Sequence, residues 1–341
     1  MRKARRTSAL GNMKRASNLW DKITDLENIK QAHLKARKGK AFYKEVQEFD
    51  SDVHKYSKII QEMLLNKTFT TSPYKVSEIF DGRKKRVIHK LPYFPDRVVH
   101  HALMQVLSPI IYKGLIRDTF QSIPNRGTSD AAKRVKMRVR EKKPRYALKL
   151  DINKYYPSVN NSILKQKLRS KIKCKDTLWL LDDIIDSNQG LPIGNYTSQI
   201  LGNFYLSELD WKIKQQIKSL GYFRYCDDLV LLSNSKSFLR DSAKLIKFEL
   251  NSYKLEVKDN LQIVDVQRQG LDFVGYRFKH STTRLRKSIA LGFINASQSM
   301  PSLSQIMAYK GWVKYSNSKM LWRKHTKHLE IRFKKQLSKK V

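Results

Sequence analysis

The chain is poor in cysteine: only Cys174 and Cys226 occur among 341 residues, and neither belongs to a C-x-x-C pair. A disulfide framework and a cysteine-rich zinc site are therefore excluded, and a reducing compartment is indicated. No stretch approaches the about 20 apolar residues that span a bilayer. The basic N-terminus also lacks the apolar segment of a signal peptide. We therefore expect a soluble intracellular protein.

Two catalytic motifs are missing as well. The sequence contains no G-x-x-x-x-G-K-[ST] phosphate loop and no G-x-S-x-G nucleophile turn, which excludes the corresponding ATPases and hydrolases. His325 and His328 have no cysteine or further histidine near them to complete a zinc site. For His100 and His101, a structural or nucleic-acid-facing role is favoured over metal binding.

Acidic residues are scarce: 30 Asp and Glu face 69 Lys and Arg, which gives a net charge of +39. The excess is largest at the two ends of the chain. Nucleic acid is the favoured partner, because each neutralised phosphate releases counterions. A polybasic membrane patch and a solubilising surface are the alternatives. The aromatic residues Trp312, Tyr315 and Trp322 lie among the C-terminal charges and suit either base stacking or ordinary helix packing.

The N-terminal half alternates helical and extended patterns. Residues 17–65 have the apolar spacing of helices. Residues 74–95 alternate like strands around an Asp81-Gly82 turn. A helix should then begin at Asp96, as its N-cap, and end near Pro109.

The second half predicts a sheet with helices. A strand is expected over 145–152, a helix over about 197–219 ended by Gly221, and a hairpin over 222–233 whose turn is Asp227-Asp228. A helix near 236–252, strands near 261–266 and 271–278, and a helical region from about 300 complete the chain. The order strand, helix, hairpin, helix, strand predicts a split βαβ, ferredoxin-like sheet.

Three carboxylates should converge in this sheet. Asp151 ends the first strand, and Asp227 and Asp228 lie on the hairpin, which is its neighbour in a split βαβ unit. Adjacent aspartates suit a hairpin turn poorly, so a functional reason is favoured. Carboxylates of this kind bind Mg²⁺, and two ions about 3.5–4 Å apart stabilise the attacking and leaving oxygens of a displacement at phosphorus. The pattern predicts a two-Mg²⁺ site, with Mn²⁺ as the alternative ion.

These segments resemble the motifs of reverse transcriptases. LKLDINKYYPSV (148–159) resembles the first palm motif, GLPIGNYTSQILGNFYLSELD (190–210) the second, and YCDD (225–228) the catalytic hairpin, in the same order and spacing. Similarity extends over about residues 75–325. It implies an α+β right-hand polymerase with fingers, a split βαβ palm and a helical thumb, and an RNA-directed DNA polymerase activity.

The resemblance also divides the chain. It implies a basic helical N-terminal extension over 1–73, fingers over 74–144, a palm over 145–279 that is partly interleaved with the fingers, and a thumb with a basic C-terminus over 280–341.

By the same resemblance, Asp151, Asp227 and Asp228 are catalytic and bind the metal ions, with the Ile152 carbonyl near an ion and Asp228 beside the primer terminus. Six residues are expected at the incoming dNTP. They are Arg86 and Lys84 at the triphosphate, Tyr156 as the gate against a 2′-hydroxyl, Gly194 and Gln199 of the second motif, and Lys258 as a general acid toward pyrophosphate. A packing tyrosine at 156 and a solvated strand lysine at 84 are the alternatives.

One departure from the general family motif concerns fidelity. Ile193 stands where most reverse transcriptases have Gln, and Gln199 where they have Pro. The variant is similar to the reverse transcriptases of diversity-generating retroelements, which implies adenine-directed mutagenic cDNA synthesis from a template-repeat RNA to diversify a target gene. Isoleucine cannot make the hydrogen bonds of an amide, and one lost contact of about 1 kcal/mol shifts selectivity nearly tenfold. A packing role for Ile193 is the alternative.

Two other functions stay open: a retron or group II intron-like reverse transcriptase of ordinary fidelity, and a non-catalytic RNA-binding scaffold. Ile193 and Gln199 disfavour the first, and the complete set of three aspartates disfavours the second. Expected partners are template RNA, an RNA–DNA hybrid, dNTPs and a small basic accessory protein, in an oligomeric assembly, without a membrane. The expected location is a bacterial cytoplasm, with the gene carried by the bacterium or by a phage.

Overall fold

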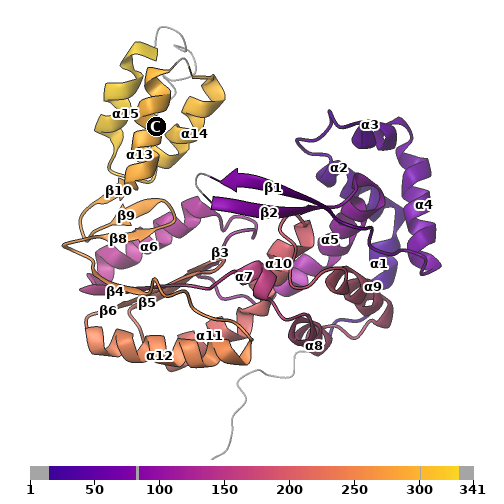
Figure 1. Ribbon diagram of the computed structural model, residues 1–341, viewed down its shortest axis with the longest axis horizontal. Coiled ribbons are helices and arrows are strands. Elements are labelled where there is room, and N and C mark those ends of the chain that lie inside the picture. The colour runs from indigo at the N-terminus through magenta and orange to yellow at the C-terminus, as the bar shows by residue number, and fades with distance from the viewer. Residues whose placement is uncertain (1–14, 82–83, 300, 330–341) are drawn as a thin grey trace, which may run out of the picture. The chain divides into compact units, whose positions relative to one another are not determined.

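The computed structural model describes residues 15–81, 84–299 and 301–329 (Figure 1). The chain forms two compact units, each assembled from separate segments. Unit 1 comprises the residues up to 115, 154–207 and 253–255. Unit 2 comprises 116–153, 208–252 and the residues from 256 onward.

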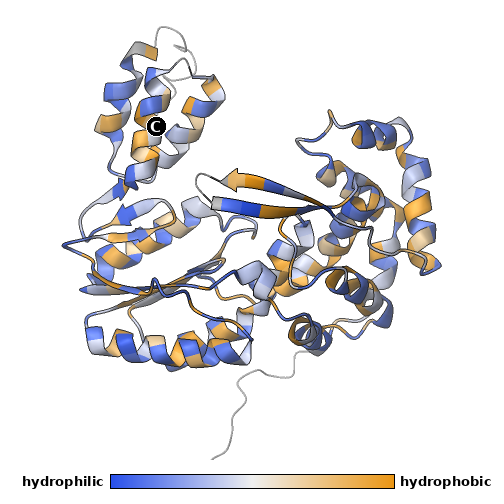
Figure 2. Ribbon diagram, viewed as in Figure 1, coloured by the Kyte–Doolittle hydropathy of each residue, from blue (hydrophilic) through white to orange (hydrophobic). Residues whose placement is uncertain are grey.

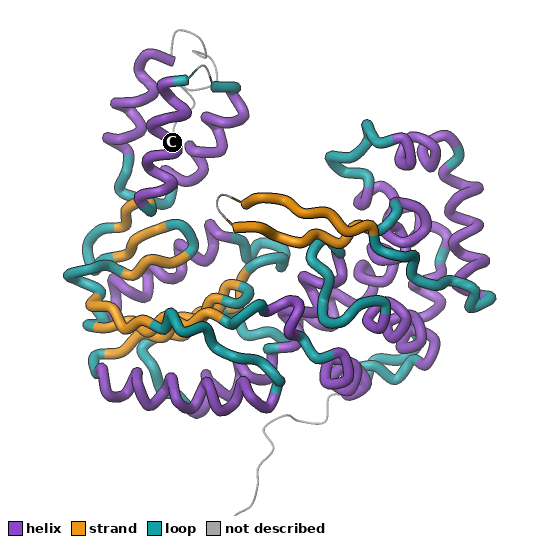
Figure 3. Tube along the Cα trace, in the orientation of Figure 1, coloured by secondary structure: helices purple, strands orange, loops and turns teal. Residues whose placement is uncertain are grey.

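Unit 1 is mainly helical, as the purple segments of the tube show (Figure 3). Its helices are α1 (Trp20–Thr24), α2 (Leu26–Ala36), α3 (Lys44–Ser51), α4 (Val53–Leu65), α5 (Val98–Lys113), α7 (Tyr155–Ser158), α8 (Asn161–Lys171), α9 (Lys175–Asp186) and α10 (Tyr196–Tyr205). The helical prediction for 17–65 is confirmed. Ile23 and Ile29 are fully buried, and Asp25 caps α2 by accepting a hydrogen bond from the Asn28 amide.

Helix α5 differs from its prediction at both ends. Asp96 does not cap it: a π-helical turn (Tyr93–Arg97) precedes the helix, and the buried Asp96 carboxylate accepts hydrogen bonds from the Ser72 amide (2.9 Å) and hydroxyl (2.8 Å). Pro109 lies inside α5, which continues to Lys113. Proline removes one backbone hydrogen bond, but packing against α2 and α10 keeps the helix continuous.

The strands β1 (Lys75–Asp81) and β2 (Lys84–Lys90) form the predicted antiparallel hairpin; Gly82 of its expected turn lies outside the described residues. The base of the hairpin is joined to the loop before α10. The His89 amide donates to the Ile193 carbonyl (2.8 Å), and a Cβ on Gly194 would overlap the His89 carbonyl oxygen. Gly194 also has a φ of +125°, so this close approach requires glycine.

The central sheet of unit 2 has five strands in the order β3 (Thr119–Phe120), β5 (Gly221–Tyr225), β6 (Asp228–Ser233), β4 (Tyr146–Asp151) and β7 (Gln262–Asp265). β4 pairs antiparallel with both β6 and β7, which is the predicted split βαβ arrangement. β3 extends the sheet by pairing parallel to β5.

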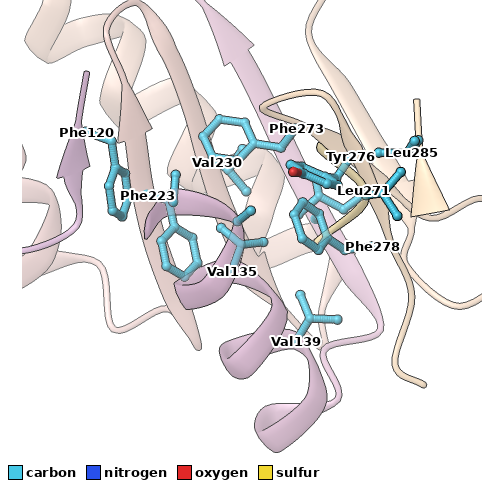
Figure 4. Packing of buried hydrophobic residues seen from close by; sticks show 14 of the residues in the cluster. Phe120, Val135, Val139, Phe223, Val230, Leu271, Phe273, Tyr276, Phe278 and Leu285 are labelled. Carbon is cyan, nitrogen blue, oxygen red and sulfur yellow. The ribbon is translucent and has the colours of Figure 1, made fainter. Parts of the chain in front are cut away.

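Helices lie on both faces of this sheet. α6 (Thr128–Lys142) covers one face, and α12 (Lys236–Ser252) packs against β4 and β6 on the other (Figure 1). Val135 of α6 lies near Phe223 and Val230 of the sheet, and Val139 belongs to the same buried cluster (Figure 4). The outer helix α12 carries hydrophilic and hydrophobic residues in alternation (Figure 2), as expected for a helix with one buried face.

The helix predicted over about 197–219 is two helices. α10 ends at Tyr205, Leu206 has a non-helical ψ of 1°, and α11 (Ser207–Gln216) follows. Gly221 does not end a helix but opens β5, where an added Cβ would lie 3.0–3.2 Å from the side chains of Arg138, Phe223 and Leu232. Its small size therefore serves packing.

A second, three-stranded sheet and a helical region complete unit 2. The sheet contains β8 (Leu271–Phe273), β9 (Tyr276–Phe278) and β10 (Thr283–Leu285), followed by α13 (Lys287–Gln298), α14 (Leu303–Val313), α15 (Lys319–Thr326) and a short 3-10 turn (Lys327–Leu329). The C-terminal helical region thus begins earlier than predicted. Trp322 is buried and stacks on Phe293 (centroids 5.4 Å apart), which favours packing over base stacking for this residue.

Within the described ranges, no helix is long and apolar enough to cross a bilayer.

Candidate active site

The ends of two neighbouring strands bring the three predicted aspartates to one edge of the central sheet. Asp151, the last residue of β4, lies opposite Asp228, the first residue of β6. The Ile152 amide donates a hydrogen bond to the Asp227 carbonyl (3.2 Å). The convergence expected from the sequence is therefore present in unit 2.

The turn of the hairpin differs from its prediction. Tyr225 and Asp228 pair across the strands, so the two-residue loop is Cys226-Asp227 and not Asp227-Asp228. Cys226 has a φ of +57°, the left-handed conformation that such loops require at their first position. Asp228 is thus part of the strand ladder, and only Asp227 projects from the turn.

Burial and mutual repulsion act on these carboxyl groups. Burial raises the pKa of Asp228 to about 6, with smaller contributions from Asp227 and Asp151. Burial, followed by the negative charge of Asp151, also raises the pKa of Asp227. Both effects disfavour the charged carboxylate. The folded protein therefore disfavours a full negative charge on both Asp227 and Asp228.

Lys258 contacts one of the three aspartates. Its Nζ donates to Asp151 Oδ1 (2.6 Å), and its backbone amide donates to the Asp151 carbonyl (2.8 Å). The neighbouring Val257 forms a bridge with Ile152. The segment after α12 is thereby fixed to the end of β4, and Lys258, which sequence motifs placed near the site, contacts one of the three aspartates.

The donor set fits an open Mg²⁺ site. It consists of carboxylates, which are hard oxygen donors, and Asp151, Asp227 and Asp228 are each partly exposed. Among the residues the structure describes, no three His, Cys, Asp or Glu side chains enclose an ion by themselves. Mg²⁺ usually keeps several waters and binds through one or two carboxylates plus substrate phosphates, so a closed protein cage is not expected.

A buried ion pair supports the hairpin, and sequence reasoning missed it. Arg224 of β5 and Asp210 of α11 are both fully buried. The Arg224 guanidinium donates from Nε to Asp210 Oδ1 (2.8 Å) and from Nη2 to Oδ2 (2.7 Å). Its Nη1 donates to the Cys226 carbonyl (2.9 Å). One side chain thus connects α11 to the turn that carries Asp227.

The remaining lone pairs of Asp210 are also used. Tyr222 donates its hydroxyl to Oδ1 (2.7 Å), and Thr119 donates to Oδ2 (3.0 Å). Burial, and then the charge of Asp210, raises the pKa of Tyr222, so the phenol remains a donor. The sequence feature that could have indicated this buried ion pair is an arginine at a strand position between aromatic residues, in YFRYCDDLVLL.

Unit 1 contains the other predicted site residues. Tyr156 is half-buried on α7, and its carbonyl accepts a hydrogen bond from the Leu191 amide (2.8 Å). A Cβ on Gly202 of α10 would lie 3.3 Å from the Tyr156 ring. The glycine therefore lets the first and second motifs pack closely. Ile193 is half-buried beside Gly194.

Gln199 is exposed on α10 and lines a pocket of about 260 Å³ with Gly194. The other residues of this pocket are predominantly basic: Lys35, Ala36, Lys38, Lys40, Arg97, His100, His101, Asn195 and Tyr196. Arg86 is exposed on β2, opposite Ile79. The side chain of Lys84 lies outside the described part of the structure.

Comparison with known families gives one match that covers most of the chain. Residues 52–278 match the profile of the family described as reverse transcriptase (RNA-dependent DNA polymerase).

Two curated relatives from Escherichia coli match shorter segments. The retron Ec73 reverse transcriptase is 30% identical over 133 residues, which is 35% of this chain and 40% of the relative. Protein YkfC of strain K12 is 23% identical over 143 residues, 38% of each protein. The matched segments thus cover about two fifths of the length of these relatives.

Solved telomerase structures share the fold. Telomerase from Candida albicans, in complex with a fragment of telomeric RNA, has a TM-score of 0.53 at 14% identity and covers 86% of this chain and 61% of that chain. Apo telomerase from Candida tropicalis has a TM-score of 0.51 at 14% identity, with 70% and 51% covered. The α+β right-hand polymerase fold predicted from the motifs is therefore confirmed.

Proposed function

Because the chain belongs to the reverse transcriptase (RNA-dependent DNA polymerase) family, we propose that it is an RNA-directed DNA polymerase that extends a primer on template RNA with dNTPs. The observation that carries this proposal is the register of β4 and β6, which sets Asp151 opposite Asp228 with Asp227 on the adjoining turn. A basic chain with a charge of +39 suits a nucleic-acid substrate.

In this proposal Asp151, Asp227 and Asp228 hold divalent cations, with the Ile152 carbonyl nearby. Two bound Mg²⁺ ions would supply stabilisation of the attacking 3′-oxygen and of the leaving pyrophosphate. Lys258 neutralises Asp151 through its 2.6 Å contact and serves as the general acid toward pyrophosphate. The raised pKa values of Asp227 and Asp228 support cation binding, because a bound cation would offset the burial and the repulsion that disfavour their charged forms.

The proposed dNTP contacts come from unit 1. Arg86 and Lys84 bind the triphosphate, Tyr156 excludes a 2′-hydroxyl, and Gly194 and Gln199 complete the site. The close packing of Tyr156 against Gly202 supports a fixed position for the gate, since a ring that cannot move is needed to reject one extra oxygen. We assign residues 74–144 to the fingers, 145–279 to the palm and 280–341 to the thumb, after an N-terminal extension over 1–73.

Primer extension on an RNA template tests this function. Incorporation should require Mg²⁺ and be lost in Asp227→Asn, but persist in the matched control Asp241→Asn, whose side chain is 73% exposed on α12. Wild-type activity in Asp227→Asn would refute the metal assignment. No incorporation by the wild-type chain with any primer would favour the RNA-binding scaffold.

At a finer level, the enzyme is proposed to be the mutagenic polymerase of a diversity-generating retroelement, encoded by a bacterium or a phage and acting with a small basic accessory protein. It would copy a template-repeat RNA with errors opposite adenine. Ile193 supports this proposal. Its backbone carbonyl is engaged by His89 (2.8 Å), and its side chain has no hydrogen-bonding group with which to check a nascent base pair.

A polymerase of ordinary fidelity is the second candidate, and the 133-residue match to a retron reverse transcriptase favours it. Deep sequencing of the cDNA separates the two. Adenine-directed errors should occur in the wild type and fall about tenfold in Ile193→Gln, but not in the matched control Ile193→Leu. Accurate wild-type cDNA would support the retron-like alternative while leaving the polymerase assignment intact.

A further inference from the structure

The β1–β2 hairpin of unit 1 has one edge that the rest of the described chain does not pair. The hairpin extends from the helices of unit 1 as a two-stranded ribbon (Figure 3). The His89 amide of β2 donates to the Ile193 carbonyl, so it points away from β1. His89 pairs with Val76, and the two members of such an antiparallel pair direct their backbone groups away from each other. The amide and carbonyl of Val76 therefore face outward, on the free edge of β1.

The alternation of the ladder extends this result along the strand. Glu78 and Phe80 follow Val76 at every second position, so their amides and carbonyls also face outward. Within the described residues, no backbone group of β1 forms a hydrogen bond beyond the ladder with β2. The strand has neither a proline nor a bulge, two devices that prevent pairing at an exposed edge. β1 is therefore open to an additional strand.

The hairpin also exposes an apolar surface on one face. Val76 and Phe80 are 58% and 76% exposed, and Val87, opposite Glu78, is 42% exposed on the same face. Hydrophobic residues are visible on β1 in Figure 2. Arg86 pairs with Ile79 and so lies on the other face, which separates this surface from the proposed dNTP contact. An exposed apolar strand with a free edge is a template for pairing with another chain.

A pocket of about 640 Å³ lies at the base of the hairpin, where the first residue of β1 and the last residue of β2 line it. Its cations are Lys40, Lys44, Lys75, Lys90 and Arg97, and the rest of its lining is largely apolar or aromatic. The one acid in the lining, Glu45, already accepts a hydrogen bond from the Tyr93 amide (2.6 Å). No lining residue belongs to the loop before α10, which covers the edge of β2.

The cations of this pocket have few anionic partners. Lys75 and Lys90 lie directly opposite each other in the ladder, where like charges are destabilising. Neither of them, nor Lys40, forms an ion pair with a residue that the structure describes. Burial, followed by the charge of Arg97, lowers the pKa of Lys40. A carboxylate brought to the pocket would offset this repulsion.

We propose that the free edge of β1 and the pocket at its base bind an extended acidic segment of a partner protein, which joins the hairpin as a third strand. An isolated two-stranded hairpin is only marginally stable, so a third strand also stabilises it. A peptide backbone supplies the alternating donors and acceptors that the edge requires, whereas phosphates offer acceptors only. A second copy of this chain, with its charge of +39, is disfavoured by repulsion, as is a basic partner.

The expected arrangement assigns a role to each part of the surface. The backbone of the segment pairs with the outward groups of Val76, Glu78 and Phe80. Its alternate apolar side chains cover Val76 and Phe80, and its acidic side chains reach Lys75 and Lys90. The inference concerns protein binding alone and does not depend on the proposed polymerase activity.

A selection from displayed peptides tests the chemistry of the partner. Random peptides as long as β1, which has 7 residues, are selected against the full chain without nucleic acid. We expect the enriched sequences to alternate apolar residues with Asp or Glu and to compete for one site. Enrichment of basic sequences, of sequences without alternation, or of none would overturn the proposal.

A proline on the free edge tests strand addition directly. Glu78→Pro removes the central outward amide without removing a ladder hydrogen bond, and Glu78→Gln is the matched control that loses the same charge but keeps the amide. Fluorescence anisotropy with the most enriched peptide should show a Kd about tenfold higher in Glu78→Pro. Glu78→Gln should bind at least as tightly as the wild type, because it loses a negative charge. Equal Kd values in the two variants would rule out strand addition.

The pocket is tested by charge removal. Lys75→Gln/Lys90→Gln should raise the Kd for the acidic peptide about fivefold at low salt and less at high salt. Arg240→Gln/Lys247→Gln removes two exposed charges of α12 and should change the Kd little. Equal losses in both variants would show a diffuse electrostatic effect and overturn the pocket as part of the site.

Two further measurements keep the proposal falsifiable. N-methylation of alternate amides of the peptide removes the same hydrogen bonds from the other side, so the test stands even if Glu78→Pro does not fold; undiminished binding of both methylated registers would refute strand addition. Single-stranded RNA that displaces the peptide, with the same loss in Glu78→Pro, would assign the surface to RNA instead. Dimers of the wild type that dissociate in Glu78→Pro would assign it to a second copy of the chain.

Discussion

Two acidic sites, one on α11 and one at the turn of the β5–β6 hairpin, are balanced in opposite ways. Asp210 is fully buried, yet Arg224, Tyr222 and Thr119 satisfy both of its oxygens. Asp227 and Asp228 are only partly buried, but burial and mutual repulsion raise the pKa of each. The charge of Asp210 is thus satisfied within the protein, whereas the charged forms of Asp227 and Asp228 are disfavoured. The difference indicates that Asp210 serves architecture and that the other carboxylates serve ligand binding.

The architectural pair has a geometric role that its energy alone does not reveal. Replacing a buried ion pair by apolar residues is often neutral for stability, so such a pair is weak support for a stabilising function. Here the third arm of the guanidinium contacts the Cys226 carbonyl in the turn before Asp227. The Arg224–Asp210 ion pair therefore holds the turn that carries Asp227 in position.

The largest expected effect comes from removing a negative charge from the cluster of Asp151, Asp227 and Asp228. Asp227→Asn should lower the rate of nucleotide incorporation by about 10³-fold or more, because a cation ligand worth several kcal/mol is lost. The free energy of unfolding should not fall, since repulsion with Asp151 is relieved. Single-turnover primer extension and urea denaturation measure the two quantities. A variant that is inactive because it is unfolded would contradict this division.

Breaking the Arg224–Asp210 ion pair should lower the free energy of unfolding. Arg224→Met leaves Asp210 buried without its main partner and should lower the free energy of unfolding by about 3–5 kcal/mol. Asp210→Asn/Arg224→Met should lose less than the single variant, because no unpaired charge remains and the amide still accepts from Tyr222. Urea denaturation followed by circular dichroism provides the comparison. A double variant less stable than Arg224→Met would show that the charge is not the cause.

His100 extends the comparison from buried acidic groups to a buried basic group. Burial, followed by the nearby His101 and Arg97, lowers the pKa of His100 to about 3, and its Nε2 has no hydrogen-bond partner in the described structure. Below the usual value of about 6.5, the unfolded chain binds this proton and the folded chain does not. The contribution of neutral His100 to the free energy of unfolding is therefore fully present above pH 6.5 and is lost as the pH falls toward 3.

Replacing His100 measures its contribution to the pH dependence of stability. In His100→Leu the loss of stability between pH 6.5 and 4 should be less steep than in the wild type, by up to about 1.4 kcal/mol per pH unit. His33, which is buried but hydrogen-bonded to Asp50 and Tyr93, provides the contrast, because its pKa is lowered by burial but raised in part by Asp50. Identical slopes in wild type and His100→Leu would refute the assignment.

The smallest expected effect concerns Lys258, the ammonium that contacts Asp151. Lys258→Met should lower the free energy of unfolding without Mg²⁺ by about 1 kcal/mol, since the contact with Asp151 is about one-third exposed and screened. Added Mg²⁺ should then raise the melting temperature more than in the wild type. Lys244→Met, which removes only an exposed pairing with Asp241 on α12, is the control and should show neither change.

The sequence alone predicted those features that depend on motifs and on the order of the elements along the chain. Asp151 and the YCDD segment were located by motif, and the split βαβ order made their strands neighbours. The errors arose where tertiary contacts override local preference. Pro109 stays inside α5, which packs against α2 and α10. The turn is Cys226-Asp227 because the pairing of Tyr225 with Asp228 fixes the register. Arg224 was missed because its partner, Asp210, is distant in sequence and only folding brings them together.

The interleaving of the two units has a consequence for synthesis on the ribosome. Unit 1 needs α10, which ends at Tyr205, and also Tyr253, whose carbonyl accepts a hydrogen bond from the Tyr205 hydroxyl (2.6 Å). The first 115 residues therefore emerge long before their unit can close. At about 5–20 residues per second, the 92 residues from 115 to 207 add roughly 5–20 s of waiting. During that time α5 lacks the later helix α10, which packs against it in the folded unit, so the nascent chain depends on chaperones or its own charge to stay dispersed.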